Sequence, residues 1–239
     1  MPQFNRRDFV FTSSGAAFGN MAVSGLASAD DDDSHTLDFS HSGLVTGQPK
    51  PLKHTSIPGF LSAKQIAPHH TAHYGGALRG YSAADAKVEA SIKSGQTLDG
   101  AAYGALKRTI SSKGNSVLLH EMYFDGLAPK APDPAADVRA AIDRRFGSVE
   151  KWALDFVASA KSAAGWAMLV KHPVNGKLYN VVSDQHSMGV IWMAIPLVVI
   201  DTYEHAFYID YQNRKSDYVE KFIDHVDWLE VNARFRTHA

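Results

Sequence analysis

The sequence contains no cysteine and no long hydrophobic run. Without cysteine there is no disulfide, no thiolate metal ligand and no cysteine nucleophile, so any metal must be bound by His, Asp or Glu. The most apolar stretch, residues 188–200, has thirteen residues and one proline, which is too short to span a bilayer. We therefore expect this stretch to be buried core and the mature chain to have no membrane anchor.

Neither sign of charge predominates, because 24 Lys and Arg stand against 25 Asp and Glu. A nucleic-acid-binding surface needs a stripe of basic side chains to neutralise phosphates, and the sequence offers none. The chain does have twelve histidines, and 45% of its 239 residues are hydrophobic. It is long enough to bury a core as one large domain or two small ones, and rich enough in imidazole to bind a metal.

The first 29 residues are predicted to be an export signal rather than part of the fold. Arg6 and Arg7 form a twin-arginine pair, residues 11–26 are weakly apolar, and residues 27–29 have the small-x-small form of a cleavage site. An ordinary amphipathic N-terminal helix would not explain these three features in this order. We expect the folded protein to leave through the twin-arginine machinery and to be periplasmic or secreted.

The strongest chemical signal lies where an apolar, β-branched run ends in a carboxylate. Residues 196–200 form this run, Asp201 follows it, and His205 comes four residues later. A strand-to-helix corner can direct both side chains into one pocket, where Mn, Fe or Zn accepts imidazole and carboxylate together. On these two residues alone, a helix-start Asp followed by a partly exposed His explains the pattern equally well.

Two further regions place histidines on helices. His69, His70 and His73 fall on one stripe of a predicted helix that begins near the capping Ser62. His120 lies in a second, more apolar helical stretch, where a single His is more often a core residue than a ligand. Spacing by itself therefore leaves open whether these side chains line a polar face, fill the core or bind a metal.

Three stretches resemble the iron/manganese superoxide dismutase family: HHTAHY at 69–74, NSVLLHEMYFDGL at 115–127 and DTYEHAFYIDYQNR at 201–214. The resemblance extends over residues 57–235. It implies that the chain disproportionates superoxide to oxygen and hydrogen peroxide at one redox-active Mn or Fe ion per subunit, with Mn slightly favoured. The metal ligands that the resemblance implies are His69, His120, Asp201 and His205.

The same resemblance implies roles for neighbouring side chains. Gln185 would hydrogen-bond the solvent molecule on the metal, although the adjacent His186 competes for this role. His73 would support the first ligand. Glu204 and Tyr208 would reach across a homodimer interface to the partner's His205 and the partner's His73, although both could equally be contacts within one chain.

Three positions depart from the family pattern. Ala77 stands where the family has a gateway tyrosine, Tyr203 replaces a tryptophan between the last two ligands, and Met168 replaces a second tryptophan. Because that phenol takes part in proton transfer, an alternative function stays open. It is a metal-binding protein of dismutase fold with little or no dismutase activity, or with another redox role.

Residue pattern and resemblance together predict an α+β fold. Helical periodicity dominates up to residue 160, and Asn175-Gly176 marks a tight turn between two strands. The predicted parts are a polar leader at 30–56, expected to be extended or disordered; an N-terminal helical hairpin domain at 57–127, with a break at Gly75-Gly76; a linker at 128–137; and a C-terminal domain at 138–239 of helices and a short three-stranded antiparallel sheet.

Overall fold

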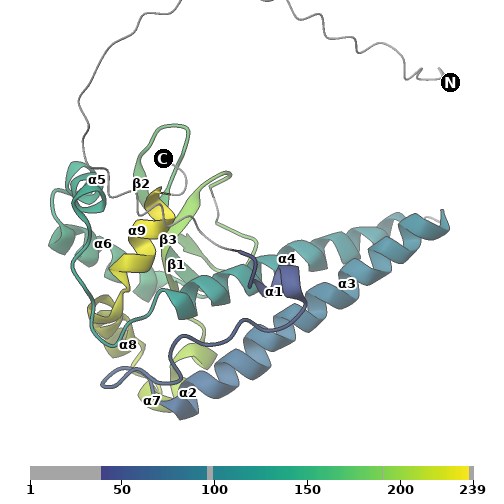
Figure 1. Ribbon diagram of the computed structural model, residues 1–239, viewed down its shortest axis with the longest axis horizontal. Helices are drawn as coiled ribbons and strands as arrows, with labels where there is room; N and C mark the ends of the chain where they lie inside the picture. The colour runs from purple at the N-terminus through teal and green to yellow at the C-terminus, as the bar shows by residue number, and fades with distance from the viewer. Residues whose placement is uncertain (1–38, 96–98, 190, 237–239) are drawn as a thin grey trace, which may run out of the picture. The chain divides into compact units, whose positions relative to one another are not determined.

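The computed structural model of the protein describes residues 39–95, 99–189 and 191–236 (Figure 1). The predicted export signal lies outside these residues. Within them the chain is rich in helix and has one three-stranded antiparallel sheet, which confirms the predicted α+β class. None of the helices in the described ranges is both long and apolar enough to cross a membrane.

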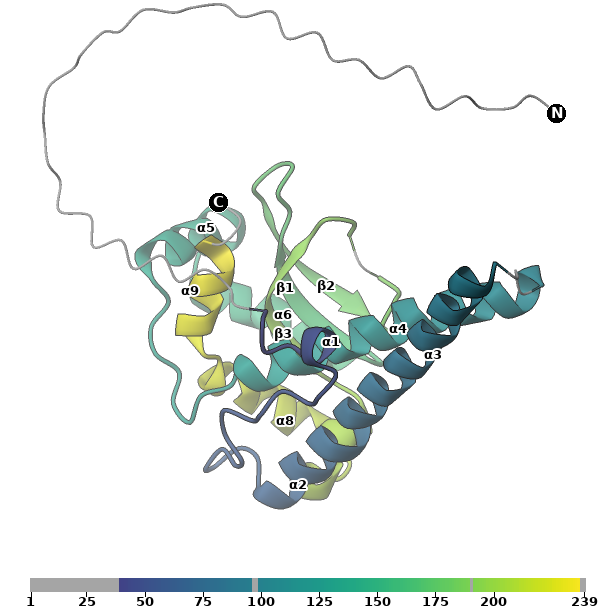
Figure 2. The same cartoon turned by 45° about the vertical axis from the view of Figure 1, so that its right-hand side comes forward.

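A long helical hairpin forms the N-terminal part of the fold. The helix α2 (Ala63–Pro68) leads through a π-helical turn, η1 (His69–Tyr74), into α3 (Gly75–Ser94), and α4 (Gly100–Asp125) returns beside α3 (Figure 2). The predicted break at Gly75-Gly76 is wrong, since α3 begins at Gly75 in ordinary helical geometry. Glycine costs only about 1 kcal/mol relative to alanine inside a helix, and packing along α4 offsets this amount.

The close approach of the two hairpin helices depends on a small residue. A Cβ atom at Gly114 of α4 would lie 3.3 Å from the ring of Tyr81 on α3. The helix α4 begins at Asp99, whose carboxylate accepts hydrogen bonds from the main-chain N–H groups of Ala101 and Ala102. It then continues without interruption through His120 to Asp125.

The described part of the leader, residues 39–56, differs from the extended or disordered segment that we expected. It forms a short helix, α1 (Gly43–Thr46), and packs against the hairpin. The main-chain N–H of Gly43 donates to Glu121 Oε1 at 2.8 Å, and Lys50 forms an ion pair with Asp125 at 2.6 Å. Polar groups of the leader thus bind side chains on α4, which lie far along the chain and could not be identified from the local sequence.

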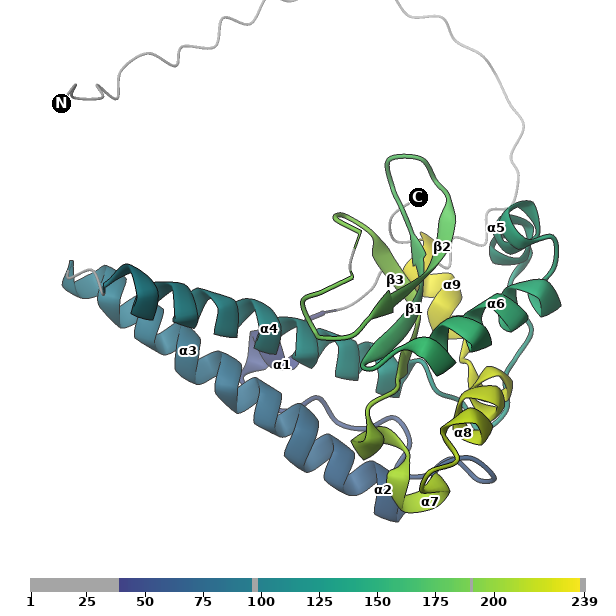
Figure 3. The same cartoon turned by 180° about the vertical axis from the view of Figure 1, so that it is seen from behind.

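The C-terminal part is built around a sheet with strand order β2-β1-β3, made of β1 (Trp166–Lys171), β2 (Leu178–Ser183) and β3 (Ile195–Asp201). The central strand β1 is buried along its whole length. Two helices precede the sheet, α5 (Ala136–Phe146) and α6 (Val149–Ser162), and α6 packs on β1 and β2 (Figure 3). The register aligns Trp166 with Asp201, so the end of β3 meets the start of β1.

Short helices complete the chain after the sheet: η2 (Glu204–Ala206), α7 (Tyr208–Tyr211), α8 (Lys215–Phe222), η3 (Ile223–His225) and α9 (Trp228–Arg236). Both α4 and α9 pack against β3. Arg234 of α9 is buried and donates to the main-chain oxygens of Leu197 in β3 and Met122 in α4. This side chain therefore ties the hairpin to the strand that ends at Asp201.

Candidate metal centre

Four side chains from four separate elements meet where β3 ends, and we call them the four-ligand cluster. They are His69 of η1, His120 of α4, Asp201 at the end of β3, and His205 of η2. Asp201 Oδ2 lies 3.1 Å from the Nε2 atom of His69, 3.7 Å from that of His120 and 3.3 Å from that of His205. The structure thus brings together all four residues that the sequence singled out as ligands.

The geometry of the cluster fits a single metal ion. All four donor atoms lie within 4.8 Å of one another. Ligand atoms bound at 2.0–2.2 Å from one ion lie about 3–4.4 Å from each other. The Nε2 atoms of His120 and His205 are buried and have no hydrogen-bond partner among the described residues, and the 3.3 Å approach of His205 to Asp201 is not aligned as a hydrogen bond. Two unpartnered imidazole nitrogens beside a buried carboxylate are what a cation would satisfy.

A main-chain carbonyl orients His120. Its Nδ1 lies 2.6 Å from the main-chain oxygen of Ser116, one turn earlier in α4. Because a carbonyl only accepts, Nδ1 carries the proton and donates it, which leaves the lone pair of Nε2 directed at the cluster. Burial, together with the neighbouring His69, lowers the pKa of His120 to about 3, so the ring is neutral at ordinary pH.

Burial and hydrogen bonding together set the charge of the cluster. Asp201 is fully buried, and burial alone would raise the pKa of its carboxyl group. The nearby imidazole groups of His69 and His205 outweigh burial, so this pKa lies well below its usual range. Desolvation also lowers the pKa of His69, against the opposing effect of Asp201. At neutral pH the imidazoles of His69 and His120 are neutral and Asp201 is ionised, which is the protonation state needed for ligation.

Gln65 holds the backbone around His205, a role that the sequence did not reveal. Its side chain is completely buried, although glutamine is mostly exposed in proteins. The Nε2 group donates to the main-chain oxygen of His205 at 2.6 Å, and Oε1 accepts from the N–H of Ile209 at 2.9 Å. One amide therefore connects α2 to the turn that carries the last ligand. In the sequence, the only indication of this role is that Gln65 lies one helical turn before His69.

Aromatic rings enclose the cluster. His205, whose side chain is 21% exposed, stacks on His73 at a centroid distance of 3.8 Å and on Tyr203 at 5.3 Å. The ring centroids of Tyr123 and Phe124 of α4 lie 5.4 and 4.9 Å from that of His69 and cover this side of the cluster. His73 thus contacts a ligand of its own chain.

A buried pair of tyrosines supports Asp201 from behind. The hydroxyl group of Tyr218 donates to the main-chain oxygen of Asp201 at 2.8 Å and lies 2.9 Å from the hydroxyl group of Tyr123. Burial raises the pKa of both phenols, so both remain protonated and able to donate. This pair connects α8 and α4 to the corner where β3 ends.

The structure separates Gln185 from His186. Gln185 is exposed, and the hydrogen bonds made to it within the described ranges reach its main-chain oxygen. The ring of His186 lies 6.4 Å from that of His120, and its Nδ1 accepts from the indole N–H of Trp166 at 3.0 Å. That Gln185 hydrogen-bonds the solvent on the metal stays a prediction. Of the two adjacent residues, His186 is the one whose ring lies beside the cluster. Trp166, which fixes this ring, was not identified from sequence.

Four further positions that the sequence singled out are divided between the core and the surface. Ala77 and Met168 are buried in the hydrophobic core, on α3 and β1. Glu204 and Tyr208, the residues expected at a homodimer interface, are both exposed. Their side chains are therefore available at the surface next to His205.

Comparison with known proteins agrees with this arrangement. Residues 134–234 match the family described as iron/manganese superoxide dismutases, C-terminal domain. The chain is 34% identical to "Superoxide dismutase [Fe]" of Aquifex aeolicus, over 81% of this chain and 92% of that one. It is 32% identical to "Superoxide dismutase [Mn] 2" of Haloferax volcanii, over 78% of this chain and 93% of the other.

Proposed function

Since the chain belongs to the iron/manganese superoxide dismutase family, we propose that it is a superoxide dismutase whose single Mn or Fe ion is held by the four-ligand cluster. The observation that carries this proposal is the pair of buried, unpartnered Nε2 atoms of His120 and His205 beside the Asp201 carboxylate. The relatives are named for Mn and for Fe, and both metals accept this donor set.

A bound Mn or Fe ion would supply one-electron redox chemistry between its +3 and +2 states, so that one superoxide is oxidised to oxygen and another is reduced to hydrogen peroxide. The residues of the chain hold the ion's ligands in place and exclude bulk water. Gln65 and Tyr218 fix the backbone at the last two ligands, and the rings of Tyr123 and Phe124 close one side of the cluster. Reduction of superoxide to peroxide consumes two protons, so the site also needs proton donors.

Solvent at the cluster delivers these protons, and we propose His186 as the side chain that hydrogen-bonds this solvent and orients it. The indole of Trp166 has only a donor to offer, so the Nδ1 atom of His186 is the unprotonated nitrogen and Nε2 carries the proton. Burial lowers the pKa of His186, which keeps the ring neutral with this single N–H. Within the described residues Nε2 makes no hydrogen bond, so it remains free to donate to solvent or substrate at the cluster.

Metal content and turnover test the dismutase proposal. The wild-type protein should contain about one Mn or Fe per chain and dismutate superoxide, with Mn, Fe and Zn measured in the same sample. Asp201→Asn should lose the metal and the activity, whereas Asp143→Asn, at an exposed position on α5, should retain both. A fully loaded wild-type site without turnover would refute the enzyme and establish the alternative, a metal-binding protein of dismutase fold.

Variants at adjacent positions distinguish the two residues that could hydrogen-bond the solvent at the cluster. His186→Ala should lower kcat by about a hundredfold at unchanged metal content, since loss of one preorganised hydrogen-bond donor costs about 10²- to 10³-fold. Gln185→Ala should leave kcat within about twofold, because the Gln185 side chain is exposed. The opposite ranking of the two variants would restore Gln185 to the role that the sequence suggested.

The surface beside His205 supports the proposal of a homodimer. Glu204 is exposed next to the partly exposed His205, and exposed Tyr208 and Ile209 continue the same surface. A carboxylate here could accept a hydrogen bond from an imidazole of a second copy. We expect light scattering to give twice the chain mass for the wild type and a shift toward monomer for Glu204→Lys; a wild-type monomer at high micromolar concentration would contradict the dimer.

Export remains a proposal from the first 29 residues. Arg6 and Arg7 would direct the metal-loaded, folded protein to the twin-arginine machinery, and cleavage would follow Ala29. N-terminal sequencing of protein recovered outside the cytoplasm should begin at Asp30. Arg6→Lys combined with Arg7→Lys should retain the uncleaved chain in the cytoplasm, and unaffected export of this variant would argue against the route.

A further inference from the structure

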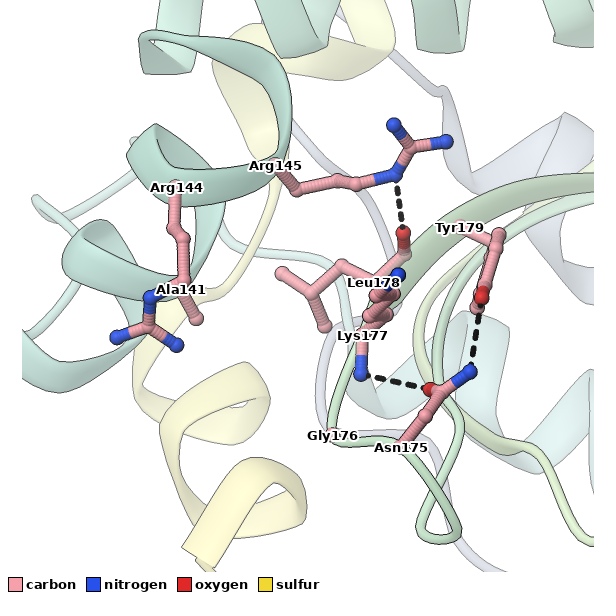
Figure 4. A pocket seen from close by; sticks show the side chains of 8 residues that line it. All are labelled: Ala141, Arg144, Arg145, Asn175, Gly176, Lys177, Leu178 and Tyr179. Atoms are coloured by element: carbon pink, nitrogen blue, oxygen red, sulfur yellow. Dashed lines mark hydrogen bonds between the residues drawn. The ribbon is translucent and has the colours of Figure 1, made fainter.

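A second candidate site lies between the end of α5 and the hairpin that joins β1 to β2 (Figure 4). It is a cleft of about 450 Å³, within the usual range for small-molecule sites. Ala141 and Leu178 are buried and provide an apolar floor, and Tyr179 contributes a half-buried ring. In Figure 4 the Leu178 side chain lies between α5 and the hairpin, and Arg144 and Arg145 leave α5 on different sides of it.

The cleft carries positive charge that the chain does not neutralise. Arg144, Arg145 and Lys177 line it, and no acidic side chain belongs to its lining. In the described part of the chain, none of these three cations forms an ion pair. Three cations around one concave, partly apolar surface favour an anion with an apolar body over either a cation or an uncharged ligand.

Arg145 is held in place for such a ligand. Its Nε group donates to the main-chain oxygen of Leu178 at 3.0 Å, and its guanidinium lies 5.5 Å from the ring centroid of Tyr179. The hydroxyl group of Tyr179 in turn accepts from Asn175 Nδ2 at 3.0 Å. The two terminal nitrogens of Arg145 make no hydrogen bond to described residues, so a fixed fork remains for the oxygens of a phosphate or carboxylate.

Compensation of the helix dipole explains only part of this charge. Arg144 and Arg145 lie in the last turn of α5, where basic residues are favoured by the negative end of the helix. That end is equivalent to roughly half an elementary charge, whereas three full charges surround the cleft. Lys177 belongs to the hairpin and not to the helix, so the dipole does not account for its position.

We propose that this cleft binds a small phosphate-bearing organic molecule, such as a nucleoside monophosphate. Its phosphate group binds the unpaired fork of Arg145 and is attracted by the charges of Arg144 and Lys177, and its apolar body lies on Ala141, Leu178 and the ring of Tyr179. Phosphate is favoured because two of its oxygens can pair with the fork of Arg145, while the other two cations of the lining add attraction for its charge.

The site is independent of the proposed dismutase centre. Asp201 pairs with Trp166 at one end of β1, whereas the hairpin leaves β1 after Lys171 at the other end. Five residues of extended strand separate the two ends by about 17 Å. Substitutions in the cleft should therefore change ligand binding without changing metal content, and loss of the metal should leave the cleft intact.

Calorimetric titration of the full, metal-loaded protein with AMP tests the proposal. We expect saturable binding at one site, at least tenfold weaker binding of adenosine and of inorganic phosphate alone, and a decrease in affinity as salt rises. Arg144→Ala combined with Lys177→Ala should weaken AMP binding at least tenfold, while Lys87→Ala, an exposed lysine on α3, should not. Metal content and circular dichroism of each variant establish that it is folded.

Three results would overturn the inference. They are the absence of saturable AMP binding to the wild type, equal affinity for adenosine, and unchanged AMP affinity in the folded double variant. Equal affinity for inorganic phosphate and AMP would likewise refute the part assigned to the apolar floor. Because none of these measurements depends on superoxide, the cleft and the dismutase proposal can fail separately.

Discussion

Replacing Gln65 by methionine tests whether a single amide holds the backbone of the last ligand. Gln65→Met keeps the length of the side chain and removes the hydrogen bonds to the main-chain oxygen of His205 and the N–H of Ile209. A buried polar group left without a partner costs about 1–3 kcal/mol. Ile209 is 54% exposed, so its N–H can turn to water, which places the total near 2–3 kcal/mol.

Urea denaturation of metal-depleted protein measures this loss without the contribution of metal binding. The midpoint for Gln65→Met should fall by an amount equivalent to about 2–3 kcal/mol, and loaded protein should bind its metal more weakly because His205 is less well placed. Gln48→Met is the matched control, since the Gln48 side chain is exposed. A loss below about 0.5 kcal/mol for Gln65→Met, or a loss equal to that of the control, would refute the reasoning.

Three further predictions concern stability. Metal-depleted protein should lose stability as the pH falls from about 6.5 toward 3, by up to about 1.4 kcal/mol per pH unit per buried imidazole. The reason is that the pKa of His120, about 3 in the folded protein, is higher in the unfolded chain, which therefore binds the proton first. Urea midpoints measured at pH 7, 6 and 5 check this prediction. Tyr218→Phe should cost about 1–2 kcal/mol in thermal unfolding, since it removes the donor to a buried carbonyl, and an unchanged melting temperature would contradict this role. Gly165→Ala should destabilise the protein by about 1–3 kcal/mol in thermal unfolding, because the new Cβ would lie 2.6 Å from the main-chain oxygen of Ser183. The control Gly100→Ala, with open space around the new Cβ, should be neutral or slightly stabilising in the same assay.

Local sequence was sufficient for the fold class and for most elements of the C-terminal part. The Asn175-Gly176 turn and the apolar run that ends at Asp201 correspond to a hairpin and to β3. These features depend on neighbours a few residues apart, whose propensities act within one strand or turn. The predicted break at Gly75-Gly76 failed for the opposite reason, because packing of α3 along α4 overrides the low helix propensity of two glycines.

The assignment of side chains around the site needed tertiary contacts. Gln185 and His186 are adjacent, and sequence could not decide which side chain turns inward. The hydrogen bond from Trp166 on β1 orients the His186 ring beside the cluster, while Gln185 is exposed. The leader shows the same limit, since its partners Glu121 and Asp125 lie more than seventy residues along the chain.

The sequence by itself determined the chemistry available to this protein. With no cysteine and twelve histidines, a metal could be bound only through imidazole and carboxylate, and the resemblance named the four side chains that the structure brings together. Only the tertiary structure decided their tautomers, their unpartnered nitrogens and the groups that orient them. The reason is physical: donor identity is a property of each residue, whereas burial and hydrogen-bond geometry arise between elements distant in the chain.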